Sequence, residues 1–107
     1  IKSVKYLFIN NNELENLKNI DQFNNLLVLD ANDNNLYDIN NLPNTLIELC
    51  CRNNKIKSIP VLEQLKILDC TNNKIQNINI YPNLTRLMCP NNYITEINNY
   101  EKLIYLD

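Results

Sequence analysis

The sequence LKILDCTNNKI, residues 65–75, determines the fold because its pattern recurs along the whole chain. Its apolar and asparagine positions are Leu65, Leu68, Cys70, Asn73 and Ile75. The same frame begins near residues 4, 26, 46, 65, 84 and 103, so successive repeats are 22, 20, 19, 19 and 19 residues apart. Self-similarity at a short period predicts a solenoid, in which each repeat forms one coil and packs only on its neighbours.

Each repeat begins with a segment in which apolar and variable residues alternate, which is typical of a strand with one buried face. Stacked coils would align these strands as a parallel sheet. The inward positions form four predicted rows: Leu7, Leu29, Leu49, Leu68 and Leu87; Ile9, Ala31, Cys51, Cys70 and Cys89; Leu14, Leu36, Ile56, Ile75 and Ile94; and Leu17, Ile39, Ile59, Ile78 and Ile97. A 19-residue coil leaves little room for a helix, so we expect extended or 3-10 return segments, with a short helical turn around residues 19–25.

Asparagine accounts for 24 of the 107 residues. Since isoleucine and lysine are also frequent, we attribute most of these asparagines to A/T-rich codons at exposed sites. Five of them, however, fall in register where the backbone leaves the sheet: Asn12, Asn34, Asn54, Asn73 and Asn92. An amide side chain both donates and accepts hydrogen bonds, so we predict that each one bonds the backbone of its own turn and of the next coil.

The frame Leu-x-x-Leu-x-(Leu/Cys)-x-x-Asn-x-(Leu/Ile) resembles the leucine-rich repeat, and its matches cover essentially the whole chain. The junctions LPNTLIEL (residues 42–49) and YPNLTRL (residues 81–87) are similar to the short repeats of bacterial effector proteins, and comparable asparagine-rich repeats occur in giant DNA viruses. The resemblance implies an α/β leucine-rich-repeat horseshoe whose concave parallel sheet binds another protein. Many such effectors carry a ubiquitin-ligase domain after the repeats, but nothing in this sequence matches one.

Residues 1–107 form one predicted repeat domain. The sequence starts without an initiator methionine or a signal-peptide pattern, and it ends in the middle of a repeat. We therefore expect it to be a segment of a longer repeat protein.

The strand positions that point away from the core form the predicted binding surface. They combine aromatic residues, methionine and arginine with scattered acids, a composition that is favoured in protein interfaces. The predicted protein-binding residues on the concave face are Tyr6, Phe8, Val28, Asp30, Glu48, Cys50, Arg52, Ile67, Asp69, Arg86, Met88 and Tyr105. The outward rows also include Asn10, Asn32, Thr71, Pro90 and Asp107.

Three of the four cysteines fall on one inward row, where a buried thiol packs as a small hydrophobe. A row that points its thiols in one direction does not converge on a metal, so we predict no metal and no cofactor. Cys50 is predicted to face outward as a free thiol. A free exposed thiol favours a reducing compartment, so we expect a cytoplasmic location, which would be the host cytoplasm for an effector or a viral protein.

Composition excludes several function classes. The chain has no histidine and no glycine, which argues against common acid–base chemistry and against glycine-rich phosphate loops. The net charge is −2, which gives no basic footprint for nucleic acid, and no apolar run is long enough to span a membrane. Asp30 and Asp69 would lie about 10 Å apart, too far to act as a catalytic pair. We therefore predict no enzymatic activity.

The sequence favours a non-catalytic module that binds a protein partner of unidentified kind on the concave face. Two alternatives stay open. The chain could be the substrate-recognition arm of a larger enzyme, such as a ubiquitin ligase. It could also be a structural solenoid that self-associates through its exposed ends, because unpaired strand edges invite pairing with another copy.

Overall fold

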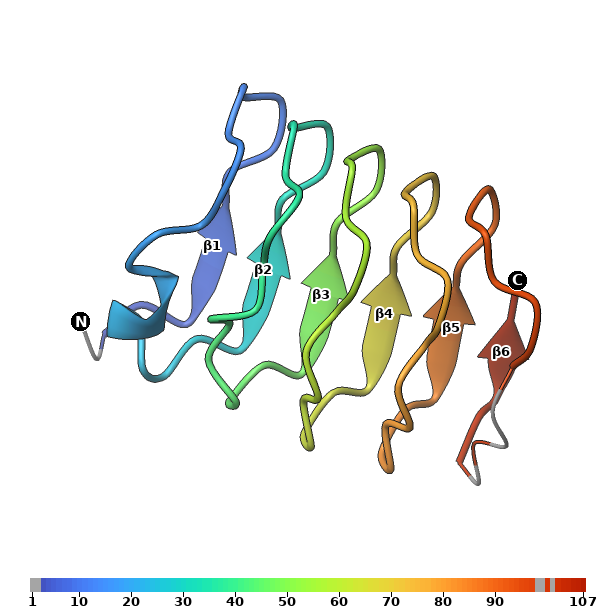
Figure 1. The fold of residues 1–107 in the computed structure, drawn as a ribbon. Helices are drawn as coiled ribbons and strands as arrows, with labels where there is room; N and C mark the ends of the chain where they lie inside the picture. The colour runs from blue at the N-terminus through green and yellow to red at the C-terminus, as the bar shows by residue number, and fades with distance from the viewer. Residues whose placement is uncertain (1–2, 98–99, 101) are drawn as a thin grey trace.

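The computed structural model describes residues 3–97, 100 and 102–107, and in these residues six parallel strands form one sheet (Figure 1). The strands are β1 (Tyr6–Phe8), β2 (Val28–Asp30), β3 (Glu48–Cys50), β4 (Ile67–Asp69), β5 (Arg86–Met88) and β6 (Tyr105–Leu106). Their order in the sheet equals their order in the sequence. The predicted solenoid with a parallel sheet is therefore confirmed, and we number its coils 1 to 6 from the repeat that contains each strand.

The strands pair in the register of the sequence repeat. Leu29 on β2 lies opposite Leu7 on β1 and Leu49 on β3, and Leu68 on β4 continues the same line. The central residue of each strand from β2 to β5 is buried. Since side chains alternate along a strand, the two flanking residues face the opposite side of the sheet.

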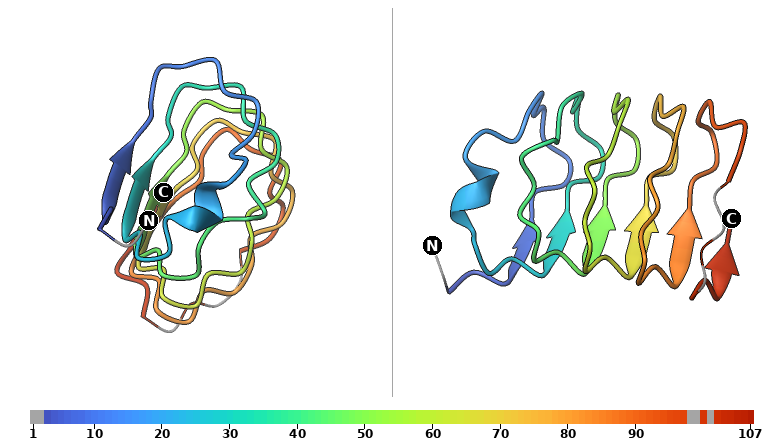
Figure 2. Two further views of the ribbon diagram at one scale, coloured as in Figure 1. Left: turned by 90° about the vertical axis from the view of Figure 1, so that its left-hand side faces the viewer. Right: turned by 60° about the horizontal axis from the view of Figure 1, so that its bottom comes forward.

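The return segments run behind the sheet and close each coil on the far side from the strands (Figure 2). Among the described residues, the one helix is the 3-10 helix η1 (Ile20–Gln22), in the long first repeat. It lies within the expected helical turn around residues 19–25. No α-helix occurs in the described residues, so the helical part of the expected α/β class is reduced to this single turn.

The core follows the predicted rows in the central coils, where Leu49, Leu68 and Ile75 are at most 1% exposed. The end coils differ from the prediction. Leu14 is 37% exposed and Ile97 is 41% exposed, although both were expected to point inward. Their exposure has a physical reason, because a core side chain in a solenoid is covered only when a complete coil packs on each side of it.

A fifth buried row, which the sequence analysis missed, lies in the return segments and consists of Leu42, Leu62, Tyr81 and Tyr100. The Tyr81 hydroxyl donates a hydrogen bond to the Pro60 carbonyl at 3.1 Å, and the Tyr100 hydroxyl donates to the Asn79 carbonyl at 2.6 Å. Burial raises the pKa of Tyr81 well above its usual range. The 19-residue spacing of the last three members was the signal that could have identified this row.

Candidate protein-binding surface

The structure brings the predicted binding residues together on one side of the sheet. One row follows the strand starts and contains Tyr6, Val28, Glu48, Ile67, Arg86 and Tyr105. The second row contains Phe8, Asp30, Cys50, Asp69 and Met88. We call these two rows, together with the exposed Arg52 beyond β3, the outer sheet face.

Exposed aromatic side chains lie at both ends of the outer sheet face. Tyr6 and Phe8 flank the inward Leu7 on β1 and are 61% and 66% exposed. At the other end, Tyr105 on β6 lies against Arg86, whose guanidinium carbon is 5.3 Å from the ring centroid. This is a cation–π contact, and it holds a flat aromatic–arginine surface in place.

Asp69 departs from the prediction because it is only 8% exposed. Its carboxylate accepts hydrogen bonds from the Thr71 hydroxyl at 2.7 Å and from the Thr71 backbone amide at 3.2 Å. Arg52 approaches the second carboxylate oxygen, with 3.5 Å between Nε and Oδ2. The carboxylate is therefore occupied within the protein. Asp69 holds Arg52 and Thr71 in position and presents little surface to a partner.

Neighbouring polar groups on this side are also engaged internally. Asn32, expected to point outward, is 8% exposed, and its side-chain oxygen accepts a hydrogen bond from the Arg52 backbone amide at 2.6 Å. Asp30 accepts from the Asn32 backbone amide at 3.2 Å. Asp30 and Asp69 lie on β2 and β4 with β3 between them, so they do not form an acid pair.

Cys50 lies half-buried between charged neighbours rather than fully exposed. Burial raises the pKa of its thiol from 9.0 to about 11, and the carboxylates of Glu48, Asp30 and Asp69 contribute in the same direction, while Arg52 opposes them. Cys51 and Cys70 are buried, as expected for members of an inward row. All four cysteines are free thiols.

Near neutral pH, we expect native Cys50 to react with iodoacetamide about a hundredfold more slowly than an ordinary exposed thiol, because only the thiolate is nucleophilic and each pKa unit lowers its fraction tenfold. Peptide mass spectrometry after timed labelling measures the rate. Glu48→Gln removes a negative charge and should speed the reaction, whereas Arg52→Gln should slow it. A faster reaction in Arg52→Gln would contradict this account of the thiol.

The in-register asparagines hold the turns that follow the strands. Asn73 is 6% exposed, and its Nδ2 donates to the carbonyls of Cys70 at 3.0 Å and Thr71 at 3.3 Å in its own turn. The same nitrogen donates to the Cys51 carbonyl at 2.9 Å, and Oδ1 accepts from the Ile56 amide at 3.1 Å. Both inter-coil partners belong to the preceding coil, opposite to the direction predicted.

The same bonding recurs along the row at Asn34, Asn54 and Asn92. Asn12 in coil 1 differs, because it is exposed and its side-chain amide donates to the Ile9 and Asn10 carbonyls of its own turn. Each asparagine after the first therefore connects its coil to the one before it.

A second row of polar residues precedes this one, and its members have a left-handed backbone: Asn11, Asp33, Asn53, Asn72 and Asn91, with φ between 57° and 61°. Glycine usually occupies such positions, but this chain has none. Asparagine and aspartate tolerate this conformation better than other residues with a side chain. The codon-bias interpretation is therefore wrong for these positions, and their place directly before each in-register asparagine was the missed signal.

Two negative findings apply to the described residues. These residues contain no group of three or more histidine, cysteine or acidic side chains that could hold a metal ion. None of the helices found in residues 3–97, 100 and 102–107 is long and apolar enough to cross a membrane.

Comparison with known families agrees with this geometry. Residues 45–83 match the family model for leucine-rich repeats in two copies. The matched segment contains β3 and β4, and the same coil continues before and after it. Residues 45–83 are thus leucine-rich repeats, and the solenoid formed by the described residues is consistent with that fold. Leucine-rich-repeat domains are generally non-catalytic and commonly mediate protein–protein interaction. No curated protein and no solved structure matches the chain.

Proposed function

We propose that this domain binds a partner protein through its outer sheet face. The observation that carries the proposal is the pair of exposed rings on β1, Tyr6 and Phe8, at 61% and 66% exposure. Large rings held in water on a rigid surface are typical of interaction sites, and aromatic and arginine side chains dominate binding energies at such sites. Arg86 and Met88 extend this chemistry along the sheet.

The backbone supports recognition by side chains rather than by strand addition. Every strand from β2 to β5 is paired on both sides, so its amide and carbonyl groups are already used within the sheet. A partner on the outer sheet face would therefore contact a pre-organised set of side chains. Pre-organisation lowers the entropy cost of binding, because few rotamers need to be fixed.

Charge along the face would orient the partner. Asp30 and Glu48 lie on β2 and β3, next to the aromatic end, whereas Arg86 lies on β5 beside Tyr105. An interface with separated charges of both signs selects one orientation of a complementary partner and disfavours the reverse. A partner with a basic patch over β2–β3 and an acidic or aromatic patch over β5–β6 fits this pattern.

The test is a comparison of two double variants, each of which removes two exposed apolar side chains. Tyr6→Ala with Phe8→Ala removes the exposed rings of the outer sheet face, and Tyr37→Ala with Val61→Ala removes side chains of 56% and 60% exposure elsewhere. Partners captured from cell extract by the wild type are identified by mass spectrometry, and the purified partner is then titrated calorimetrically. We expect the outer-face variant to raise Kd about a hundredfold.

The control variant should bind like the wild type, and thermal unfolding should show that both variants remain folded. Equal binding by the wild type and the folded outer-face variant would overturn the proposal. Loss of binding in the control variant alone would move the binding site to the return segments.

A second candidate function is self-association of the solenoid ends, and exposed core residues favour it. A cavity of about 420 Å³ at coil 1 is lined by apolar side chains that include Leu14 and Phe23, and at the other end Leu106, which is in register with the core residue Leu87, is 50% exposed. If association is the function, sedimentation should show a mass that rises with protein concentration, whereas a constant monomer mass would exclude it.

Two further proposals concern an attached catalytic domain and the cellular compartment. Joined to a catalytic domain, the outer sheet face would act as the substrate-recognition arm of an enzyme. We also propose a reducing location such as the cytoplasm, which is supported by the four free thiols.

A further inference from the structure

The outer sheet face carries negative charge over β2 and β3, next to the two exposed rings of β1. Phe8 on β1 lies opposite Asp30 on β2. In the neighbouring row, Val28 lies between Tyr6 and Glu48. From the spacing of parallel strands and of residues along a strand, the Cβ atoms of Asp30 and Glu48 are about 8 Å apart. One side chain of a partner laid over Val28 can therefore contact both carboxylates and a ring.

The half-buried thiol of Cys50 shows that the two carboxylates act on one point of this surface. Cys50 lies opposite Asp30 and follows Glu48 by two residues on the same side of β3. Burial raises the pKa of the thiol most, and the carboxylates of Glu48 and Asp30 raise it further. Since the influence of a charge falls with distance, both acidic groups lie close to Cys50.

The chain's own arginines serve other groups on the outer sheet face. The sequence contains two, Arg52 and Arg86. Arg52 pairs with Asp69, and Arg86 lies over the ring of Tyr105. In the described part of the chain, the acids of β2 and β3 form no ion pair. The same kinds of group, rings and carboxylates, are thus paired with arginine toward β6 but not over β1–β3.

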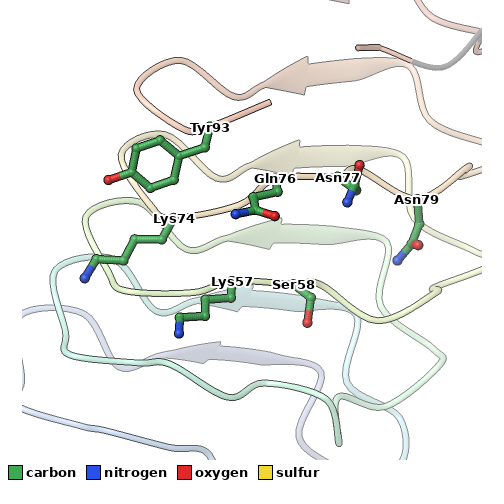
Figure 3. Close-up of a pocket in the computed structure, with 7 residues that line it drawn as sticks. All are labelled: Lys57, Ser58, Lys74, Gln76, Asn77, Asn79 and Tyr93. Carbon is green, nitrogen blue, oxygen red and sulfur yellow. The ribbon is translucent and has the colours of Figure 1, made fainter. Parts of the chain in front are cut away.

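The back of the solenoid offers no comparable place for a cation at coils 3 to 5. A hollow of about 380 Å³ on these return segments is lined by amide, hydroxyl and tyrosine side chains together with Lys57 and Lys74 (Figure 3). None of the residues that the structure places around this hollow is acidic. Because like charges repel, a cationic side chain is favoured on the sheet side over this hollow.

We propose that the partner of the outer sheet face places an arginine side chain over β1–β3. Its guanidinium donates to the carboxylates of Asp30 and Glu48, and the rings of Tyr6 and Phe8 pack beside it. Arginine fits better than lysine, because a guanidinium is planar, has five donors and stacks on aromatic rings, whereas an ammonium is a compact and strongly hydrated charge. This inference rests on the proposed partner surface and names the chemistry that the surface selects.

The experiment is an NMR titration of the isotope-labelled chain with three blocked tripeptides at low ionic strength. Their central residue is arginine, lysine or citrulline, and citrulline keeps the shape of arginine without its charge. Saturable shifts are expected at the backbone amides of Val28, Asp30 and Glu48. The arginine peptide should bind about tenfold or more tightly than the citrulline peptide, with lysine between them. Equal binding of arginine and citrulline, or shifts confined to other parts of the chain, would overturn the proposal.

A charge-matched pair of variants separates this site from general electrostatic attraction. Asp30→Asn with Glu48→Gln removes both charges, keeps the side-chain shapes and should abolish the advantage of arginine over citrulline. Asp21→Asn with Glu63→Gln makes the same charge change at exposed acids outside the outer sheet face and should leave that advantage intact. An equal loss in both pairs would overturn the proposal.

The rings are tested by Tyr6→Leu with Phe8→Leu. Leucine keeps an apolar surface but has no aromatic face on which a guanidinium can stack. The affinities of the arginine and lysine peptides should therefore become equal in this variant. An unchanged preference for arginine would contradict the proposed position of the rings.

The captured partner distinguishes a failure of this inference from a failure of the partner surface. A partner that binds the Asp30→Asn, Glu48→Gln variant like the wild type, but loses affinity for Tyr6→Ala with Phe8→Ala, would overturn the arginine contact and leave the partner surface intact. Loss of affinity for both variants would support both. Peptide binding as expected, with a partner that ignores both variants, would support the arginine site and overturn the partner surface.

Discussion

Replacing Asn73 with alanine should lower the free energy of unfolding by about 3 kcal/mol or more, because the Ile56 amide would lose its partner and three carbonyls would each lose one of their two hydrogen bonds. The side chain serves the Ile56 amide and the carbonyls of Cys51, Cys70 and Thr71, in a site that is 6% exposed. Alanine leaves a small polar cavity, and a single water there would replace only part of these bonds. Urea unfolding followed by circular dichroism measures the loss.

Two asparagines provide controls for this prediction. Asn35 is exposed, and Asn35→Ala should change the stability by less than about 0.5 kcal/mol. Asn12 bonds only within its own exposed turn, so Asn12→Ala should cost about 1 kcal/mol. Similar losses at Asn12 and Asn73 would show that the bonds to the preceding coil contribute little to stability.

Replacing Leu68 with alanine should have a comparable effect, a loss of about 3 kcal/mol or more in the free energy of unfolding. Leu68 is fully buried at the centre of β4, between Leu49 and Leu87 in the neighbouring coils. Backbone hydrogen bonds fix β4 on both sides, so the surrounding coils cannot close the cavity. A solenoid is stabilised by contacts between neighbouring coils, and this substitution weakens both interfaces of coil 4.

The end of the same row provides the control. Leu7 is only half-buried and has a described coil on one side, so Leu7→Ala should cost about 1 kcal/mol in the same urea experiment. If Leu7→Ala destabilised the chain as much as Leu68→Ala, stability would not depend on position along the stack.

The sequence was sufficient for the repeat, the strand register and the central core, because each apolar position meets the same surroundings in every coil. Leu29, Leu49 and Leu68 could be placed from their spacing alone. Asn53 and Asn72 adopt a left-handed backbone, but this requirement leaves no hydrophobic pattern in the sequence. Among so many other asparagines, these positions could not be recognised from composition. Tyr81 was missed for a different reason, since its row combines leucine with tyrosine and does not belong to the repeated frame.

Much of the candidate surface was predictable in position but not in accessibility. Alternation placed Asp69 on the outer side, yet Thr71 and Arg52 satisfy its carboxylate and leave it nearly buried. Such contacts depend on side-chain conformations that spacing does not encode.

The direction of the asparagine hydrogen bonds has a consequence for how the chain assembles. Because Asn54 caps coil 2 and Asn73 caps coil 3, each coil is completed by the one synthesised after it. A ribosome releases the chain from its N-terminus, and domains begin to fold during synthesis in that order. The solenoid can therefore grow vectorially, with every newly emerged coil locking its predecessor and leaving only the most recent coil open.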